Sequence, residues 1–233
     1  MMPAMVDPLA DSPWSAPSTV AGFAASPPNE TLVRFAAAEC IRAPGGLAID
    51  IGCGAARHAV ALAELGWQVL GTDLSRPMIE AATRRVADAE QEARVRLQLA
   101  PMDRQPVPDG SADLIVAHGI WNLARSTGEF RRAVAEAARI ARPGAGLFVF
   151  TFSRTTLPAD ARPIRGETYI FTEFSGEPQC FLTREELLDE LAAAGFVPDR
   201  GVPLSEHGAS RHGAMAGGHS PIVHEAAFRL ARH

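Results

Sequence analysis

Short apolar runs alternate with helix-length segments along most of this 233-residue chain, and this alternation restricts its fold more than any other feature. The runs that we predict as strands cover residues 46–51, 67–72, 95–99, 113–117, 147–152, 196–202 and 222–230. The segments that we predict as helices cover residues 30–42, 55–65, 76–89, 126–141 and 184–194. Strands joined by helices of this length pair in parallel, so the sequence predicts an α/β fold with a doubly wound, mostly parallel sheet.

Residues that cap helices stand at the ends of several of these segments. Asn29 and Ser75 precede predicted helices, and their side chains can accept a hydrogen bond from a helix N-terminus. Thr183 and Glu186 have the spacing of a capping box. Gly195 stands where a glycine commonly ends a helix. These signals support the helix boundaries independently of the hydrophobic pattern.

The chain is predicted to be a single domain with an N-terminal extension. Residues 1–28 contain six prolines and are predicted to form an irregular arm, in which Trp14 and Phe23 are candidates for closing over a bound ligand as a lid. Residues 29–233 make up the domain, and two long segments at about 155–182 and 203–221 interrupt its regular pattern. Long ordered loops in a compact domain are often functional, so we expect both insertions on the substrate side.

The composition excludes several classes of function. The formal net charge is −5 and no basic stripe is present, so we expect no nucleic-acid partner. All 22 basic residues are Arg, which excludes a P-loop lysine and a Schiff-base lysine. The three cysteines are far apart, so we expect neither a disulfide framework nor a metal site. Cysteines without disulfides are typical of a reducing compartment, so we expect a cytoplasmic location. No signal peptide or membrane span is predicted, and the sequence does not indicate an oligomeric state.

A glycine-containing turn follows the first predicted strand. Its residues are Asp50-Ile51-Gly52-Cys53-Gly54, and Asp73 ends the second predicted strand 21 positions after Gly52. Glycines at this place allow a tight turn and let the backbone approach a ligand closely. A carboxylate at the end of the second strand can accept both ribose hydroxyls of an adenosine. The pattern therefore predicts an adenosine-containing cofactor.

Two cofactors with an adenosine fit this arrangement, and charge distinguishes them. The NAD fingerprint G-x-G-x-x-G requires glycine at position 57, where the chain has Arg57. Asp50 would also lie close to the pyrophosphate of NAD and repel it. S-adenosylmethionine (SAM) carries an ammonium and a sulfonium, which a neighbouring carboxylate stabilises. SAM is therefore favoured over NAD, and an NAD-dependent oxidoreductase is disfavoured.

The segment resembles motif I of the class I SAM-dependent methyltransferases, D-x-G-x-G-x-G, with Ala56 in place of the third glycine. The resemblance covers roughly residues 30–200. It includes Met102-Asp103, the segment 113–118, which is similar to motif IV, and Arg142-Pro143-Gly144-Ala145, which is similar to an R-P-G-G turn. It implies a Rossmann-like sheet of seven strands in the order 3-2-1-4-5-7-6, with the last strand antiparallel.

The resemblance also implies the cofactor and the residues that bind it. SAM is expected as the methyl donor and S-adenosylhomocysteine (SAH) as the product. Asp103 is expected to accept the adenine amino hydrogens, and Met102 is expected to stack on the adenine ring. The residues expected to bind the cofactor are Asp50, Gly52, Cys53, Gly54, Asp73, Leu74, Met102, Asp103 and His118.

Two histidines are candidates for a general base. His118 ends the fourth predicted strand, where ligands gather in such sheets; alternatively only its backbone contacts SAM. His207 lies in the segment 204–207, which is similar to the stretch of tellurite-resistance methyltransferases that bears an active-site histidine; alternatively this loop is only solvated. Trp121 and Arg211 are further candidates for substrate contacts, although a tryptophan more commonly packs in the core.

The sequence therefore predicts a methyltransferase that acts on a small molecule. A nucleic-acid base methylase usually has an N/D-P-P-Y/F motif after the fourth strand, and this chain has residues 117–120, Ala-His-Gly-Ile, at that place. A protein substrate and a non-catalytic SAM-binding role remain as alternatives, because methyl transfer does not always need a fixed catalytic side chain.

Overall fold

The computed structural model describes residues 9–10, 12–208 and 220–231 of the chain. The helices are α1 (Pro17–Ala25), α2 (Glu30–Arg42), α3 (Arg57–Glu64), α4 (Arg76–Asp88), α5 (Thr127–Ile140) and α6 (Arg184–Ala193). The strands are β1 (Leu47–Ile51), β2 (Gln68–Asp73), β3 (Val95–Leu99), β4 (Ala112–His118), β5 (Ala141–Phe152), β6 (Ile170–Phe171), β7 (Gln179–Cys180), β8 (Phe196–Pro198), β9 (Ser205–Gly208) and β10 (Ile222–Leu230).

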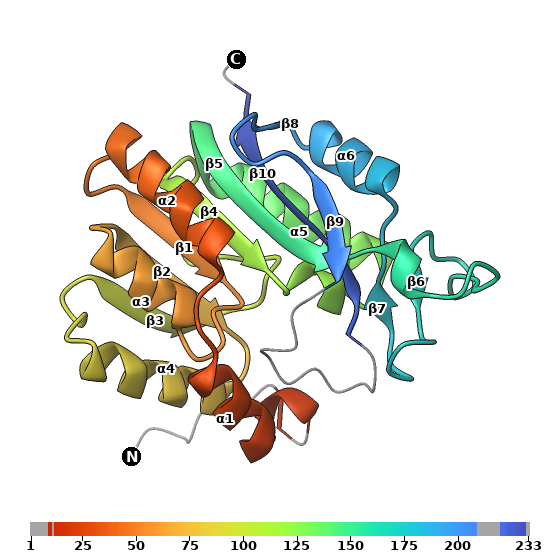
Figure 1. Cartoon of the computed structure of the whole chain (residues 1–233), viewed down its shortest axis with the longest axis horizontal. Coiled ribbons are helices and arrows are strands. Elements are labelled where there is room, and N and C mark those ends of the chain that lie inside the picture. Colours follow the sequence, from red (N-terminus) through yellow and green to blue (C-terminus); the bar gives the residue numbers. More distant parts are fainter. Residues whose placement is uncertain (1–8, 11, 209–219, 232–233) are drawn as a thin grey trace.

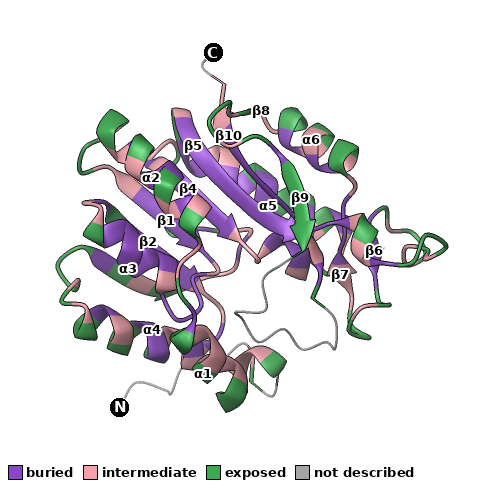
Figure 2. Ribbon diagram, in the orientation of Figure 1, coloured by how far each residue is buried: buried purple, intermediate pink, exposed green. Residues whose placement is uncertain are grey.

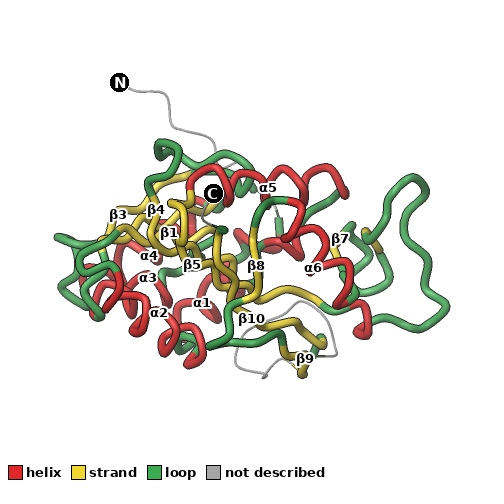
Figure 3. Tube along the Cα trace, turned by 90° about the horizontal axis from the view of Figure 1, so that it is seen from above, coloured by secondary structure: helices red, strands yellow, loops and turns green. Residues whose placement is uncertain are grey.

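The main sheet has the strand order β3-β2-β1-β4-β5-β10-β8. Strands β1 to β5 pair in parallel, and β10 pairs antiparallel with both β5 and β8 (Figure 1). The predicted Rossmann-like order with an antiparallel last strand is therefore confirmed. On one side of the sheet lie α2 and α3, and on the other lies α5 (Figure 3). The two layers of helices bury both faces of β1 and β4, which explains why these strands are nearly continuous apolar runs, whereas the edge strand β3 alternates between buried or half-buried and exposed residues.

The predicted caps form in the structure. The side chain of Asn29 accepts a hydrogen bond from the backbone N–H of Leu32, and Ser75 accepts one from Met78. Thr183 and Glu186 make both hydrogen bonds of a capping box at the start of α6. Each cap satisfies a donor that a helix N-terminus would otherwise leave unpaired. The helix starts that the capping residues predicted are therefore confirmed.

Two segments differ from the sequence-based expectations. The arm was expected to be irregular, but it contains a 3-10 turn at Pro13–Ser15 and then α1. Both begin with a proline, which is well suited to the first position of a helix because its fixed φ matches the helix and its missing N–H is not needed there. The insertion 203–221 was expected to be a loop, but its first part forms β9, which pairs with the start of β10. Figure 2 shows β9 exposed along its length, which explains why it lacks the apolar pattern of a buried strand.

The strand β5 begins six residues earlier than predicted, at Ala141 instead of Leu147. Arg142 donates a hydrogen bond of 2.6 Å to Asp113 of β4, and this ion pair holds the start of β5 against β4. Among the described residues, no helix is both long and apolar enough to cross a membrane.

Candidate cofactor and active site

The turn between β1 and α3 is built from backbone in the left-handed region. Gly52 has φ +70°, Gly54 has φ +52°, and Ala56, at the third glycine position of the motif, has φ +61°. A Cβ atom on Gly52 would lie 2.7 Å from the side chain of Ile120, so that position has no room for a larger residue. The turn thus needs glycine both for its conformation and for the close approach of neighbouring groups.

Asp50 lies in β1 directly before this turn and is 1 % exposed. Its Oδ2 atom has no hydrogen-bond partner among the described residues. Burial raises the pKa of Asp50, Arg57 opposes this shift and the nearby Asp73 reinforces it, so that the pKa is about 7. A buried carboxylate oxygen without a donor is costly, so this atom is suited to a cationic group or an N–H donor of a ligand.

Asp73 joins the turn to the start of α4. Its Oδ2 atom accepts a hydrogen bond of 2.9 Å from the backbone N–H of Gly54, and its Oδ1 atom accepts one of 2.8 Å from Ser75. Each carboxylate oxygen can accept more than one hydrogen bond, so these contacts are compatible with additional bonds from ribose hydroxyls. The following residue, Leu74, is half-buried, and Cys53 is buried beneath the turn.

The loop after β3 carries the residues expected at the adenine. Met102 is buried at 8 % exposure, and Asp103 forms an ion pair of 3.0 Å with Arg132 of α5. The sequence did not single out Gln105, which is buried in this loop. Its Oε1 atom accepts a hydrogen bond of 2.9 Å from Thr72 of β2, and its Nε2 atom donates one to the carbonyl of Pro101. Gln105 therefore fixes the loop against the sheet.

His118, at the end of β4, lies between polar and aromatic groups. Its ring stacks on Phe150 with a centroid distance of 4.1 Å. Nε2 lies 3.4 Å from the side-chain nitrogen of Asn29, and Nδ1 lies 3.4 Å from Arg57. Burial, and to a smaller degree Arg57, lowers the pKa of His118 to about 3. The imidazole is therefore neutral at pH 7 and a weak proton acceptor, which fits poorly with the expected role as general base.

His207, on β9, has a side chain that is 44 % exposed. Its Nε2 atom lies 3.9 Å from Oε1 of Glu225, a buried residue of β10. Asn29 donates a hydrogen bond of 2.8 Å to the other carboxylate oxygen of Glu225. The sequence indicated Asn29 only as a helix cap and did not single out Glu225. The pairing of β9 with β10 is what brings His207 near this carboxylate.

Trp121 and Arg211 were the other candidates for substrate contacts, and the structure describes only Trp121. Trp121 is fully buried, and its ring packs edge-on against Phe130 with a centroid distance of 5.9 Å. The structure thus places Trp121 in the core between β4 and α5, the alternative that the sequence left open. Arg211 lies outside the described residues.

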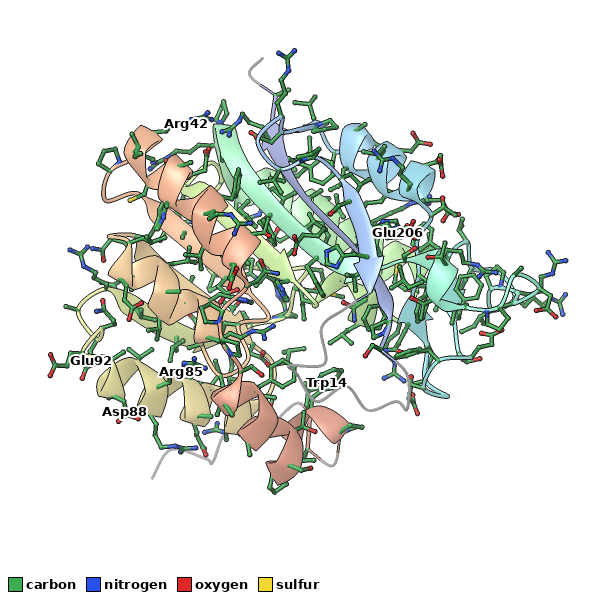
Figure 4. The ribbon with its side chains drawn as sticks, in the orientation of Figure 1. Trp14, Arg42, Arg85, Asp88, Glu92 and Glu206 are labelled. Carbon is green, nitrogen blue, oxygen red and sulfur yellow. The ribbon has the colours of Figure 1, made fainter. Side chains whose placement is uncertain are left out.

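The N-terminal arm covers the turn. A Cβ atom on Gly54 would lie 3.3 Å from the ring of Phe23, and Trp14 meets Phe23 edge-on with a centroid distance of 6.3 Å. Arg85 of α4 donates hydrogen bonds to the carbonyls of Ala24 and Ser26. Figure 4 shows Trp14 on the arm, beside the edge at which the parallel strands end. The arm thus packs on the turn through Phe23, and its role as a lid stays a prediction.

Comparison with known proteins agrees with this geometry. A family model described as a methyltransferase domain matches residues 49–150. A demethylmenaquinone methyltransferase from Parafrankia sp. is 35% identical over 185 residues, which cover 66% of this chain and 71% of that protein. The chain belongs to the class I SAM-dependent methyltransferases.

Two further methyltransferases illustrate the range of relatives. The ubiquinone/menaquinone biosynthesis C-methyltransferase UbiE of Geotalea daltonii is 31% identical over 125 residues, and this chain spans about half (51%) of its length. A 1,6-didemethyltoxoflavin-N1-methyltransferase from Burkholderia thailandensis, solved with its substrate and SAH, shares the fold at a TM-score of 0.60 and 19% identity. That alignment covers 87% of this chain and 80% of the other.

The cofactor of this family is SAM, and the residues present fit it. The unpartnered oxygen of Asp50 complements an ammonium group, and Gly52 and Gly54 give the turn after it the left-handed backbone that the family's motif I requires. Among the described residues, no cluster of three or more His, Cys, Asp or Glu side chains is arranged to hold a metal ion.

Proposed function

We propose that this chain transfers the methyl group of SAM to a small-molecule acceptor. The observation that carries the proposal is the buried carboxylate of Asp50, which has an unpartnered oxygen directly before the glycine-containing turn after β1. In this proposal Asp50 faces the ammonium of SAM, and Asp73 accepts the ribose hydroxyls. Met102 and Asp103 contact the adenine.

When bound, SAM supplies an already activated methyl group, so the protein's main task is to align the acceptor. An acceptor that must lose a proton also needs a base, which contributes about 10²- to 10⁴-fold to the rate. We propose His207 for this role, because it is partly exposed and lies near the carboxylate of Glu225. His118 is neutral and held by Asn29 and Arg57, which suits a residue that orients its neighbours.

The acceptor is proposed to be a small molecule with an apolar ring. An aromatic cluster lies where β5 ends: Phe174 meets Phe152 at 5.4 Å and Phe181 at 5.8 Å between ring centroids. Phe174 is half-buried, so it is suited to contact a ligand at this edge. The names of the relatives, which include menaquinone and toxoflavin methyltransferases, support a ring-containing acceptor.

The direct test is to incubate the protein with labelled SAM and a panel of quinols, phenols, amines and thiols, and to follow SAH release. Acceptor-dependent SAH release from one of these classes supports the proposal. A protein extract and ribosomal RNA serve as alternative acceptors, and transfer to either of them alone would contradict it. SAH binding without any transfer would favour a non-catalytic SAM-binding protein.

The three cysteines are unpaired in the structure. Unpaired cysteines are typical of a reducing compartment, and on this basis we propose a cytoplasmic location.

A further inference from the structure

Arg57 is a half-buried cation that has only neutral partners. It is the first residue of α3, directly after the glycine-containing turn. Its Nη1 atom lies 3.4 Å from the carbonyl of Pro27, its Nη2 atom lies 3.4 Å from Nδ1 of His118, and its guanidinium is 6.0 Å from the ring centroid of Phe23. Among the described residues, no carboxylate lies within 4.0 Å of it.

Asp50 is the acidic residue whose charge acts on Arg57, and it also lacks a charged partner among the described residues. The two residues lie on either side of the turn, one at its start and one at its end, and they do not form an ion pair. They are close enough that Arg57 lowers the pKa of Asp50, while burial lowers the pKa of Arg57. A half-buried cation and a buried anion that do not pair with each other are together complementary to a zwitterion.

The methionine part of SAM is such a zwitterion, because it ends in an α-ammonium and an α-carboxylate. We propose that Arg57 binds the α-carboxylate of SAM and SAH, opposite the ammonium site at Asp50. A guanidinium presents a planar fork of five N–H donors that matches a carboxylate, and the long contacts with Pro27 and His118 engage only one donor on each terminal nitrogen. This inference rests on the proposed function and adds that the site requires an intact α-amino-acid group.

Calorimetry with three probes tests the role of Arg57 without any methyl acceptor. The probes are SAH, its decarboxylated analogue, which retains the amine, and 5′-methylthioadenosine, which lacks both charged groups. Wild-type protein is expected to bind SAH on the order of 10- to 100-fold more tightly than the decarboxylated analogue. Arg57→Gln is expected to lose most of this difference, because it weakens SAH binding while the affinity for the decarboxylated analogue changes little.

Arg85→Gln is the matched control. Arg85 is also a partly buried arginine that donates to carbonyls of the N-terminal arm, at Ala24 and Ser26. Its replacement is expected to preserve the preference for SAH over the decarboxylated analogue. Arg57→Lys, which retains the charge, is expected to keep part of that preference.

The outcomes separate this inference from the proposed function. If Arg57→Gln keeps the wild-type preference, or if wild-type protein binds SAH and the decarboxylated analogue equally, the role of Arg57 is wrong and the methyltransferase assignment is unaffected. If wild-type protein binds none of the three probes, the proposed function itself fails, and this inference fails with it.

Discussion

Asp50 is the residue whose ionisation should respond most directly to a ligand. Its pKa is raised to about 7, mainly because burial disfavours the charged form. Without a ligand, the carboxylate is therefore partly protonated near neutral pH. An ammonium placed beside it stabilises the ionised form, so binding at this site should be linked to the release of a proton.

We expect the affinity for SAH to rise as the pH increases from about 5.5 to about 7.5 and to level off above the pKa of Asp50. Calorimetry in two buffers of different ionisation enthalpy measures the proton released on binding. In Asp50→Asn both the rise and the proton release should disappear. An affinity for SAH that is independent of pH in the wild type would show that Asp50 does not face the ammonium.

The same shift predicts how Asp50 affects the stability of the ligand-free protein. Its pKa is raised above the ordinary aspartate value of 3.8, so the folded state binds a proton more tightly than the unfolded state. The protonated carboxyl of Asp50 therefore adds to the free energy of unfolding. This stabilisation is fully present below about pH 4 and is lost as the pH rises through about 7. Urea titrations between pH 4 and 8 should show a steeper fall in the free energy of unfolding for the wild type than for Asp50→Asn. Parallel pH profiles would contradict this.

Asp73 gives a second prediction at this scale. Charge-assisted hydrogen bonds from the ribose hydroxyls are worth about 1.5–3 kcal/mol each, so Asp73→Ala should weaken SAH binding by on the order of 10²-fold or more. Asp88→Ala, which removes the same charge from an exposed position on α4, is the control and should bind SAH normally. An affinity of Asp73→Ala close to that of the wild type would exclude the ribose contact.

Asp50 and Asp73 could be predicted as cofactor-binding residues because their positions are fixed relative to strand ends and glycines. Gln105 could not, because its role depends on a hydrogen bond to Thr72, a residue 33 positions away. In the sequence, Arg57 was evident only as a departure from the NAD fingerprint, because the lack of an acidic partner is a property of the folded chain. Local spacing thus identifies residues at turns, whereas the partners of a buried polar group become visible only in the structure.

Among the elements, α2 depends in two ways on Asn29, the residue that precedes it. Asn29 caps the helix, and it also donates a hydrogen bond to the buried carboxylate of Glu225. The cap was evident from the sequence, because asparagine before a helix is a local signal. The contact with Glu225 was not, since it joins residues 196 positions apart.

Asn29→Ala should therefore cost more stability than the loss of an ordinary cap. Loss of a cap costs about 1 kcal/mol, and a buried carboxylate that loses a donor adds about 1–3 kcal/mol. Ser126→Ala, which removes only the cap of α5, is the matched control and should cost about 1 kcal/mol. Chemical denaturation measures both, and equal losses would show that the contact with Glu225 contributes nothing.

Elements without an apolar pattern were the hardest to predict. The strand β9 has the sequence Ser-Glu-His-Gly and is a strand only because β10 supplies its hydrogen-bond partners. Likewise, α1 contains no buried residue, yet its position fixes Phe23 over the turn at Gly54. Hydrophobic periodicity indicates elements that bury a face, and these two elements do not.

At the scale of the whole molecule, Arg229 connects distant parts of the chain. From β10 it donates hydrogen bonds to Glu39 of α2, to Asp199 after β8 and to the carbonyl of Gly144. The side chain of Glu39 is only 5 % exposed. The order of elements and the antiparallel last strand were predictable from the family resemblance, but this junction was not, because its members are far apart in the sequence.

Arg229→Met should destabilise the fold by about 3–5 kcal/mol, because it removes two hydrogen bonds from the buried carboxylate of Glu39 and leaves it only the ion pair with the exposed Arg42. Arg34→Met removes a surface ion pair with Glu30 and is expected to cost less than about 1 kcal/mol. Adding Glu39→Gln to Arg229→Met should recover part of the loss. Urea denaturation gives all three values, and a loss for Arg229→Met as small as that of Arg34→Met would contradict the prediction.

The place of β10 within the sheet has a consequence for how the protein is made. This strand is the last of the chain, yet it lies between β5 and β8. During synthesis, β5 therefore keeps an unpaired edge until residues 222–230 have left the ribosome. An unpaired edge next to apolar strands can pair with another chain, so this is the stage at which nascent chains are most prone to aggregate.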